Sequence, residues 1–225
     1  MSYRRAALIA FVTFACTSTP LLAQEDPQPP ENAPKRIMGV IPNYTTVERD
    51  EESTPVTTKM RFRMASLNSF DEFVYPFIGF TAALADLRHQ EPAWEQRGVP
   101  GYSKHFAAAF ADNTLGNMMT TAAVSAVARQ DPRYFVLGEG GFWHRAAYAA
   151  SRSLVTRGSG GGRRFNVSEI GGNAIAAALS NLYYPPGSHS TSDTIERGGL
   201  QVMWDTAANE LKEFWLDIRH ALHHH

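Results

Sequence analysis

Apolar residues along this chain recur mainly at the three-to-four-residue spacing of an α-helix. Met60, Met64 and Leu67 follow this spacing, and a longer apolar run covers residues 73–87. No segment alternates between apolar and polar positions clearly enough to indicate a strand. The pattern predicts an all-α fold, a compact bundle of about five or six Gly- and Ala-rich helices with an extended N-terminal arm.

Capping residues and breakers set the bounds of the predicted helices. Thr54 and Pro55 offer an N-cap with proline at the first helical position, and Ser69 with Glu72 forms a capping box for the next helix. The first predicted helix begins at residue 54. The others cover residues 73–87, residues 102–129, about residue 141 to residue 157, residue 168 to just before 185, and residue 190 or 192 to about 222.

The first 23 residues have the pattern of a secretory signal peptide. Arg4 and Arg5 precede an apolar stretch at 6–15, and Ala23 is the small residue that signal peptidase requires. A retained membrane anchor is the alternative, but the apolar stretch is shorter than the roughly 18 residues of a span. Lipid attachment at Cys16 is disfavoured by the residues before it. We therefore expect export to the periplasm or envelope.

The rest of the chain divides into an arm and one domain. Residues 24–53 begin with a stretch rich in Pro, Gln and acidic residues and are predicted to form a disordered or extended N-terminal arm. Residues 54–222 are long enough for one helical domain. The three histidines at 223–225 resemble the remnant of a purification tag.

Small residues are concentrated in the predicted helices, at 107–111, 122–126, 146–150 and 171–178. Such faces let helix axes approach closely, both in membrane bundles and in tightly packed soluble ones. The longest uncharged helical run, residues 113–128, contains Asn, Thr and Ser and is shorter than a membrane span. A soluble or peripheral domain is therefore favoured over an integral one.

Composition and the motifs that are missing disfavour several function classes. The formal net charge of −1 gives no electrostatic basis for binding nucleic acid. Cys16 is the single cysteine and lies within the predicted signal peptide, so no disulfide or thiolate metal site is expected in the mature chain. The Gly-rich loops at 138–141 and 158–162 lack the endings of nucleotide loops, and hydrolase and zinc motifs are missing. We predict no cofactor and no metal, and the sequence does not indicate an oligomeric state.

Three predicted helices carry acid-and-amide groups among small and apolar residues. The groups are Asp112, Asn113 and Asn117; Glu169 and Asn173; and Asp205 and Asn209. A spacing of four places the members of each pair on one helix face. One interpretation is an acid–base site in which Asp112 or Glu169 works with His144 or His105 as proton carrier. The alternative is a structural network that fixes how the helices pack. An open pocket lined by these acids and an arginine would favour chemistry, and a closed, fully hydrogen-bonded cluster would favour structure.

Arginines gather around the fourth predicted helix. They are Arg129, Arg133, Arg145, Arg152 and Arg157. As a cluster they could bind a phosphate or another anion, with Asn117 and Asn173 as further candidate binding residues. The alternative is a set of separate, exposed or snorkelling side chains.

Short motifs are spread over nearly the whole mature chain. They are 36–44 (RIMGVIPNY), 68–71 (NSFD), 130–135 (QDPRYF), 165–169 (FNVSE), 180–185 (SNLYYP) and 212–218 (KEFWLDI). As a set, they resemble an uncharacterised family of exported helical proteins of soil Gram-negative bacteria. The resemblance implies a place in the cell envelope and carries over no catalytic residues.

These features favour an exported cell-envelope protein that is not an enzyme and acts by contact with lipid or protein at a membrane face. Tryptophans at 94, 143, 204 and 215 and the arginine set are compatible with an interfacial position. The alternative is a hydrolase acting on an envelope ester, glycoside or phosphoester through buried carboxylates and arginines.

Overall fold

The computed structural model describes residues 36–37, 41–49, 54–87, 94 and 98–223. The predicted signal peptide and the first part of the predicted arm lie outside the described residues. The helices are α1 (Thr58–Phe70), α2 (Val74–Leu87), α3 (Val99–Asn117), the π-helix η2 (Met118–Val124), α4 (Ser125–Val127), α5 (Phe142–Ser151), α6 (Val167–Ser180), the 3-10 turn η3 (Pro186–Ser188) and α7 (Thr191–His223). The strands are β1 (Arg36–Ile37), β2 (Ile41–Pro42), β3 (Thr46–Val47), β4 (Gln130–Asp131), β5 (Tyr134–Phe135), β6 (Val155–Gly158) and β7 (Arg163–Phe165).

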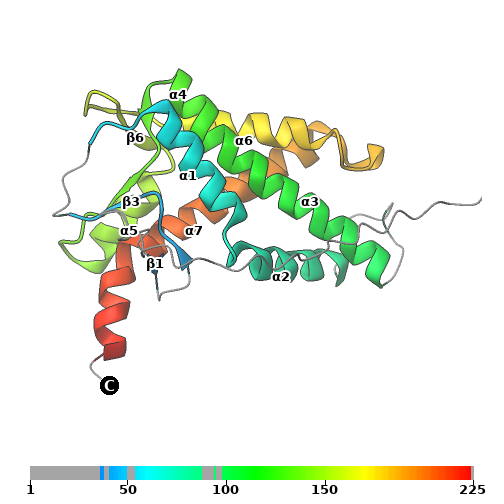
Figure 1. Cartoon of the computed structure of the whole chain (residues 1–225), viewed down its shortest axis with the longest axis horizontal. Helices are drawn as coiled ribbons and strands as arrows, with labels where there is room; N and C mark the ends of the chain where they lie inside the picture. Colours follow the sequence, from blue (N-terminus) through cyan, green and yellow to red (C-terminus); the bar gives the residue numbers. More distant parts are fainter. Residues whose placement is uncertain (1–35, 38–40, 50–53, 88–93, 95–97, 224–225) are drawn as a thin grey trace, which may run out of the picture. The chain divides into compact units, whose positions relative to one another are not determined.

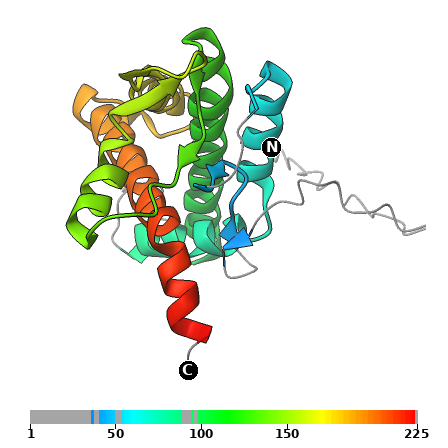
Figure 2. The ribbon, with the colours of Figure 1, turned by 90° about the vertical axis from the view of Figure 1, so that its left-hand side faces the viewer.

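The described part is mostly helical, as the hydrophobic spacing predicts. α1, α2 and α6 pack against the helical stretch formed by α3 and η2 (Figure 1). α7 packs against α6 and α5, and its C-terminal end extends away from the other helices in both views (Figures 1 and 2). No helix among the described residues combines the length and the apolar character that crossing a membrane requires.

The starts of the first two helices differ from the prediction. Thr57, not Thr54, caps α1, because its hydroxyl accepts a hydrogen bond from the backbone N–H of Met60 at 3.2 Å. The predicted capping box at Ser69 is wrong. Ser69 lies inside α1 and donates to the carbonyl of Ala65 at 2.8 Å, as hydroxyls within helices do.

The long helix predicted at 102–129 is an unbroken helical stretch that begins earlier, at Val99, and changes type in the middle. α3 leads directly into the π-helix η2, which is followed by the single turn α4. A π-helix is wider than an α-helix and is uncommon, and such segments are often found at functional sites. Side-chain spacing alone does not reveal this change, because the apolar residues continue through it.

Short strands replace part of the fourth predicted helix. α5 ends at Ser151, and β6 then pairs antiparallel with β7 and with β4. The β-branched Val155 and Thr156 favour extended backbone. Gly161, at φ +89°, reverses the chain in a conformation that favours glycine. The prediction of helix up to residue 157 is therefore wrong, and the fold is mainly rather than purely α-helical. β3 adds a parallel pair with β5.

A fully buried carboxylate joins α7 to the rest of the domain. Glu213 has no exposed surface and accepts hydrogen bonds from the Tyr134 hydroxyl at 2.8 Å and from the backbone N–H groups of Leu137 and Gly138 at 2.9 Å. Arg145 of α5 completes the set, donating from Nε at 2.9 Å. Every contact is charge-assisted, so this closed cluster fixes α7 against α5 and the segment after β5.

Candidate functional site

Two adjoining hollows lie among the helices. The larger, here called the cleft, has a volume of about 570 Å³ and is bordered by α2, α3, α7 and residues 184–188. The smaller, the chamber, has a volume of about 100 Å³ and is bordered mainly by η2, α6 and α7. Asn117, Thr120 and Asp205 line both hollows, so the chamber adjoins the cleft directly.

The cleft has an apolar wall. Phe77 and Ile78 of α2 and Leu200 and Trp204 of α7 provide it. The rings of Phe77 and Trp204 meet edge to face, with centroids 5.3 Å apart, and both side chains remain more than a third exposed. An apolar surface of this kind, with a few polar groups, is typical of a site for a small molecule.

Asp112 is the main acid of α3 in the cleft. Tyr184 donates its hydroxyl to Asp112 Oδ2 at 2.8 Å, and the hydroxyl of Tyr183 donates to Oδ1. Burial raises the pKa of the Asp112 carboxyl, and the two phenol hydrogen bonds oppose that effect. His105, one of the two predicted proton carriers, also lines the cleft, and its ring packs edge-on against Trp94 at 5.2 Å.

Two polar atoms in the cleft lining have no partner. Asn113 Nδ2 and Gln201 Oε1 are both buried and make no hydrogen bond. An unpaired buried donor or acceptor costs about 1–3 kcal/mol. One donor and one acceptor left open beside the same hollow indicate a place where water or a ligand supplies the missing partners.

The chamber is polar on almost every side. Asn173 of α6 donates from Nδ2 to Glu169 Oε1 at 3.0 Å and to Asp205 Oδ2 at 3.2 Å, so one amide holds two carboxyl groups together. Lys212 lies one turn beyond Asn209 on α7, and both line the same space. The predicted faces of α6 and α7 therefore converge.

The two carboxyl groups influence each other's protonation. Burial raises the pKa of Glu169 well above its usual value, and the neighbouring carboxyl of Asp205, to which Glu169 is hydrogen-bonded, raises it further. A hydrogen bond between two carboxyl groups needs a proton, so the pair shares one. Burial lowers the pKa of Lys212, against the pull of the same two carboxyl groups.

Glu169 and Lys212 lie deep in the fold and still keep part of their surface open. Both residues are half-buried, and yet desolvation is the main cause of both pKa shifts. The two observations agree because both residues border the chamber. Their ionisable ends border the chamber, where partial desolvation makes electrostatic interactions stronger than in bulk water.

Local features of the fold position these groups. Asn166 caps α6 through the backbone N–H of Glu169 at 3.0 Å and so fixes the turn that carries the acid. Gly172 lets α6 approach η2 closely, since a Cβ at this position would be 2.8 Å from Thr120 Cα. The π-helix presents Thr120 and Thr121 to the chamber.

We compared the chain with protein-family models, curated proteins and solved structures. Nothing matches. The site is therefore interpreted from its own geometry and chemistry.

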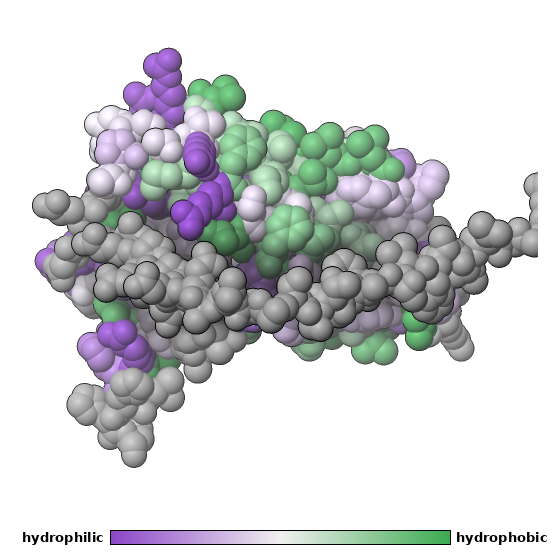
Figure 3. Space-filling view, in the orientation of Figure 1, coloured by the Kyte–Doolittle hydropathy of each residue, from purple (hydrophilic) through white to green (hydrophobic). Residues whose placement is uncertain are grey.

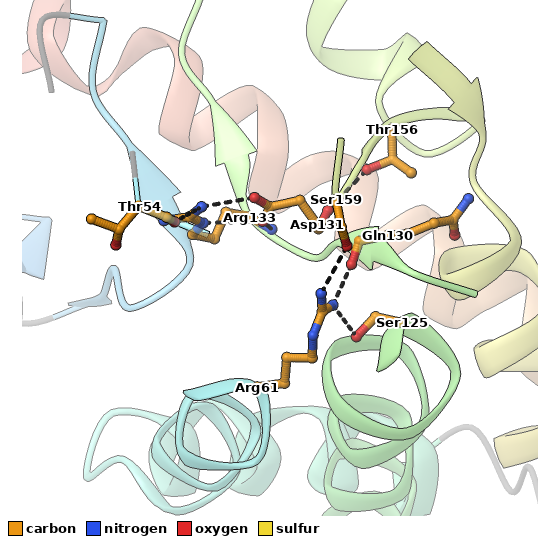
Figure 4. Close-up of polar contacts among 8 residues, drawn as sticks. All are labelled: Thr54, Arg61, Ser125, Gln130, Asp131, Arg133, Thr156 and Ser159. Atoms are coloured by element: carbon orange, nitrogen blue, oxygen red, sulfur yellow. Dashed lines mark hydrogen bonds and ion pairs between the residues drawn. The ribbon is translucent and has the colours of Figure 1, made fainter. Parts of the chain in front are cut away.

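A hydrogen-bond network joins α1 to α4 and β4 (Figure 4). The buried Arg61 of α1 donates to Ser125 Oγ at 3.0 Å and to the carbonyl of Gln130. The side chain of Gln130 in turn accepts from the N–H of Ser168 at 2.8 Å. These contacts join α1, α4 and β4 to the start of α6, the helix that carries Glu169.

The five predicted arginines do not all gather at one site, because only Arg133 and Arg152 line the chamber. Arg145 binds Glu213 and Asp217, and Arg133 makes an ion pair of 2.7 Å with Asp131 while lining the chamber. Arg129 is exposed, in the left-handed conformation, and borders neither hollow. Sequence proximity could not show that these side chains point in different directions.

Arg152 lines the chamber as Arg133 does, but it forms no ion pair with a described residue. Its guanidinium lies over the ring of Tyr148 at 5.4 Å and donates no hydrogen bond to another described residue. The proposed proton carrier His144 is on the exposed side of α5, beside Gly140, and lines neither hollow. His144 is therefore removed from the candidate site.

Sequence reasoning missed Lys212. Asp205, Asn209 and Lys212 follow each other at four and three residues, which places them on one face of a helix. That spacing was available in the sequence, but a lysine on a helix usually indicates a solvated surface. Asp112 and Glu169 both border open hollows, and an arginine accompanies each, Arg197 in the cleft and Arg152 in the chamber. This arrangement favours a binding or catalytic site over a closed network.

Proposed function

We propose that this protein binds an uncharged amphipathic molecule, with its apolar chain in the cleft and its hydroxyl-bearing end at the chamber. The observation that carries the proposal is the shared lining of the two hollows, one with an apolar wall and the other polar. A volume of about 570 Å³ is in the range of small-molecule sites. The export expected from residues 1–23 would place such a protein among envelope lipids.

The polar groups indicate the chemistry of the bound head. Asp112 and Asp205 can accept hydrogen bonds from hydroxyls. Asn113 and Gln201 offer a free donor and a free acceptor, which a hydroxyl satisfies equally well. Asp193 and Glu196 add further acidic groups to the cleft, so an anionic head would meet like charge there.

Binding of 1-decanoylglycerol, measured by calorimetry, tests the proposal. Ala109 lines the cleft from α3, so Ala109→Phe fills part of it and is expected to raise Kd at least tenfold. Ala107 is on the exposed face of the same helix, and Ala107→Phe serves as the matched control with unchanged Kd.

The chain-length dependence gives a second readout. Each added methylene that enters the cleft should contribute up to about 0.8 kcal/mol, until the cleft is full. Failure of the protein to bind glycerol esters of any chain length would contradict the proposal, as would equal Kd values for the two phenylalanine variants.

A second candidate function, docking on an anionic membrane face, is favoured by the surface around β6 and β7. The arginines there are Arg129, Arg157, Arg163 and Arg164, all exposed, and none forms an ion pair with a described residue. Exposed apolar side chains lie in the same segments, namely Val127, Leu154, Phe165 and Val167. Figure 3 shows hydrophilic and hydrophobic residues side by side at the end that carries α4 and β6. Arginines attract anionic lipid, and the apolar side chains suit the interface.

Sedimentation with vesicles that contain phosphatidylglycerol measures this docking. Each arginine contributes about 1 kcal/mol near such a surface. Replacing Arg157, Arg163 and Arg164 by Gln should therefore weaken binding at least tenfold. Removing the same charge elsewhere, at Lys59, Arg63 and Arg219, is the control and should change binding far less. Equal losses of vesicle binding in the two triple variants would mean that the attraction is nonspecific. The surface around β6 and β7 would then be excluded as the docking site.

A further inference from the structure

We infer that the chamber is a hydrolytic site that cleaves a carboxylic ester of a small polyol, with Asp205 as general base, Glu169 as general acid, and Lys212 and Arg152 as oxyanion-binding groups. The inference rests on the proposed binding of an amphiphile in the cleft. It adds a reaction to that binding and assigns a role to each charged group of the chamber.

The position of the two carboxyl groups separates their roles. Asp205 borders both hollows, whereas Glu169 borders the chamber alone. An acyl chain in the cleft therefore brings its ester carbonyl to Asp205 and places the alcohol portion in the chamber beside Glu169. With about 100 Å³, the chamber holds roughly three water-sized volumes, which suits a small polyol but not a second long chain.

The proton distribution supports the same assignment. The pKa of Glu169 is raised, so Glu169 is the member of the pair that holds the shared proton. Asn173 bonds to both groups and holds one acid and one base in a fixed relation. Two carboxyl groups with different protonation are the usual equipment for combined acid and base catalysis.

Lys212 and Arg152 have N–H groups that make no hydrogen bond to a described residue. Lys212 Nζ has one hydroxyl contact, at 3.4 Å to Thr45 Oγ1. Arg152 lines the chamber without donating a hydrogen bond from its guanidinium to a described residue. Donors that border the site before the reaction begins can stabilise the negative charge of a tetrahedral intermediate.

The reaction balances with water as the only co-reactant. Asp205 accepts a proton from water as the water oxygen forms a bond to the ester carbonyl carbon. The negative charge on the former carbonyl oxygen is held by Lys212 and Arg152. The bond to the alcohol oxygen then breaks, and Glu169 transfers its proton to that oxygen. The products are a carboxylic acid and an alcohol, and the proton on Asp205 returns to Glu169 through their hydrogen bond.

Release of decanoate from 1-decanoylglycerol measures the activity, and calorimetry measures binding separately. Asp205→Asn and Glu169→Gln should each lower kcat roughly 100- to 10,000-fold, with Kd for the ester changed by less than about threefold. Glu210→Gln is the matched control, because Glu210 is a partly buried carboxyl of the same helix that lines neither hollow. It should retain the activity of the unaltered protein.

An activated ester distinguishes the acid from a structural role. The 4-nitrophenolate group leaves without being protonated, so 4-nitrophenyl decanoate should restore most of the rate of Glu169→Gln and little of that of Asp205→Asn. An unaltered protein that binds the glycerol ester but releases no decanoate overturns the hydrolysis and leaves the binding proposal standing. If the protein does not bind the glycerol ester, both the binding proposal and the hydrolysis are contradicted. Equal losses for Glu169→Gln on the two esters would contradict the assignment of the acid.

Discussion

Gly172 of α6 lies against Thr120 of the π-helix so closely that a Cβ at residue 172 would be 2.8 Å from Thr120 Cα and 2.9 Å from its backbone nitrogen. Because the obstacle is backbone, no side-chain rotation relieves it. The contact holds Asn173 and Glu169 beside the residues that η2 presents to the chamber.

Gly172→Ala is therefore expected to lower the free energy of unfolding by about 1–3 kcal/mol. The neighbouring Gly171 is the control, since an added Cβ there would meet its nearest atom, Val167 Cγ1, at an ordinary 3.7 Å. Gly171→Ala should stabilise the protein by roughly 0.5–1 kcal/mol through the helix preference of alanine. Urea unfolding of the two variants measures both effects, and equal destabilisation would contradict the close approach.

Glu213 and Arg145 supply a test of the closed cluster on α7. Glu213→Gln replaces one carboxylate oxygen with an NH₂ group that faces donors from Tyr134, Leu137 or Arg145. Loss of one partner of a buried ion pair costs about 3–5 kcal/mol, and this variant should lose an amount of that order. Asp217, whose side chain is 55% exposed, also binds Arg145.

Asp217, the exposed partner of Arg145, provides the comparison. Asp217→Asn is expected to cost less than about 1 kcal/mol, because water screens an exposed ion pair. Thermal unfolding followed by circular dichroism at neutral pH ranks the two variants. A larger loss for Asp217→Asn than for Glu213→Gln would mean that the cluster does not hold α7.

Part of this site could be predicted from the sequence, because helical spacing shows which residues share a face. The spacing of Glu169 with Asn173 and of Asp205 with Asn209 indicated two polar helix faces, and the structure brings those faces together. The spacing did not show what lay opposite them, because tertiary contacts decide this. A buried lysine such as Lys212 has the same local pattern as an exposed one.

Other misses have equally local causes. The proline at 55 suggested a helix start that Thr57 provides instead. The segment at 155–158 follows an Ala-rich helix, and its pairing with β4 and β7 depends on residues far along the chain. His144 was a candidate proton carrier, but its side chain is exposed, whereas the neighbouring Arg145 is buried.

The titration of Glu169 predicts how stability depends on pH. The folded state raises its pKa above the unfolded value of about 4.5, so the native protein binds more protons over that interval. The free energy of unfolding should therefore fall as pH rises from about 4.5 through the raised pKa, by up to about 1.4 kcal/mol per pH unit.

Glu169→Gln removes this group, so its stability curve should be flatter over the same interval. Urea unfolding at half-unit steps of pH, for both proteins, gives the two slopes. If the slopes are identical, Glu169 titrates normally in the folded protein, and the shared proton is excluded.

Asn173 offers a test of the link between the carboxyl groups. Asn173→Leu removes the amide that donates to Glu169 and Asp205, and it leaves the two acids without their common donor. We expect a further rise in the pKa of Glu169 and a loss of decanoate release of at least tenfold, because the two acids are no longer held in register. Activity measured against pH checks this, and a profile identical to that of the unaltered protein would contradict it.

The central claim is that a proton-sharing pair of carboxyl groups lies next to the site of the amphiphile. Carbon-13 NMR of the side-chain carboxyl groups of Glu169 and Asp205, recorded against pH with and without 1-decanoylglycerol, tests it most directly. The account predicts that Glu169 keeps its proton to a pH well above 4.5, and that the ester shifts the signals of both groups. Two carboxyl groups that both ionise below about pH 5 and ignore the ester would contradict it.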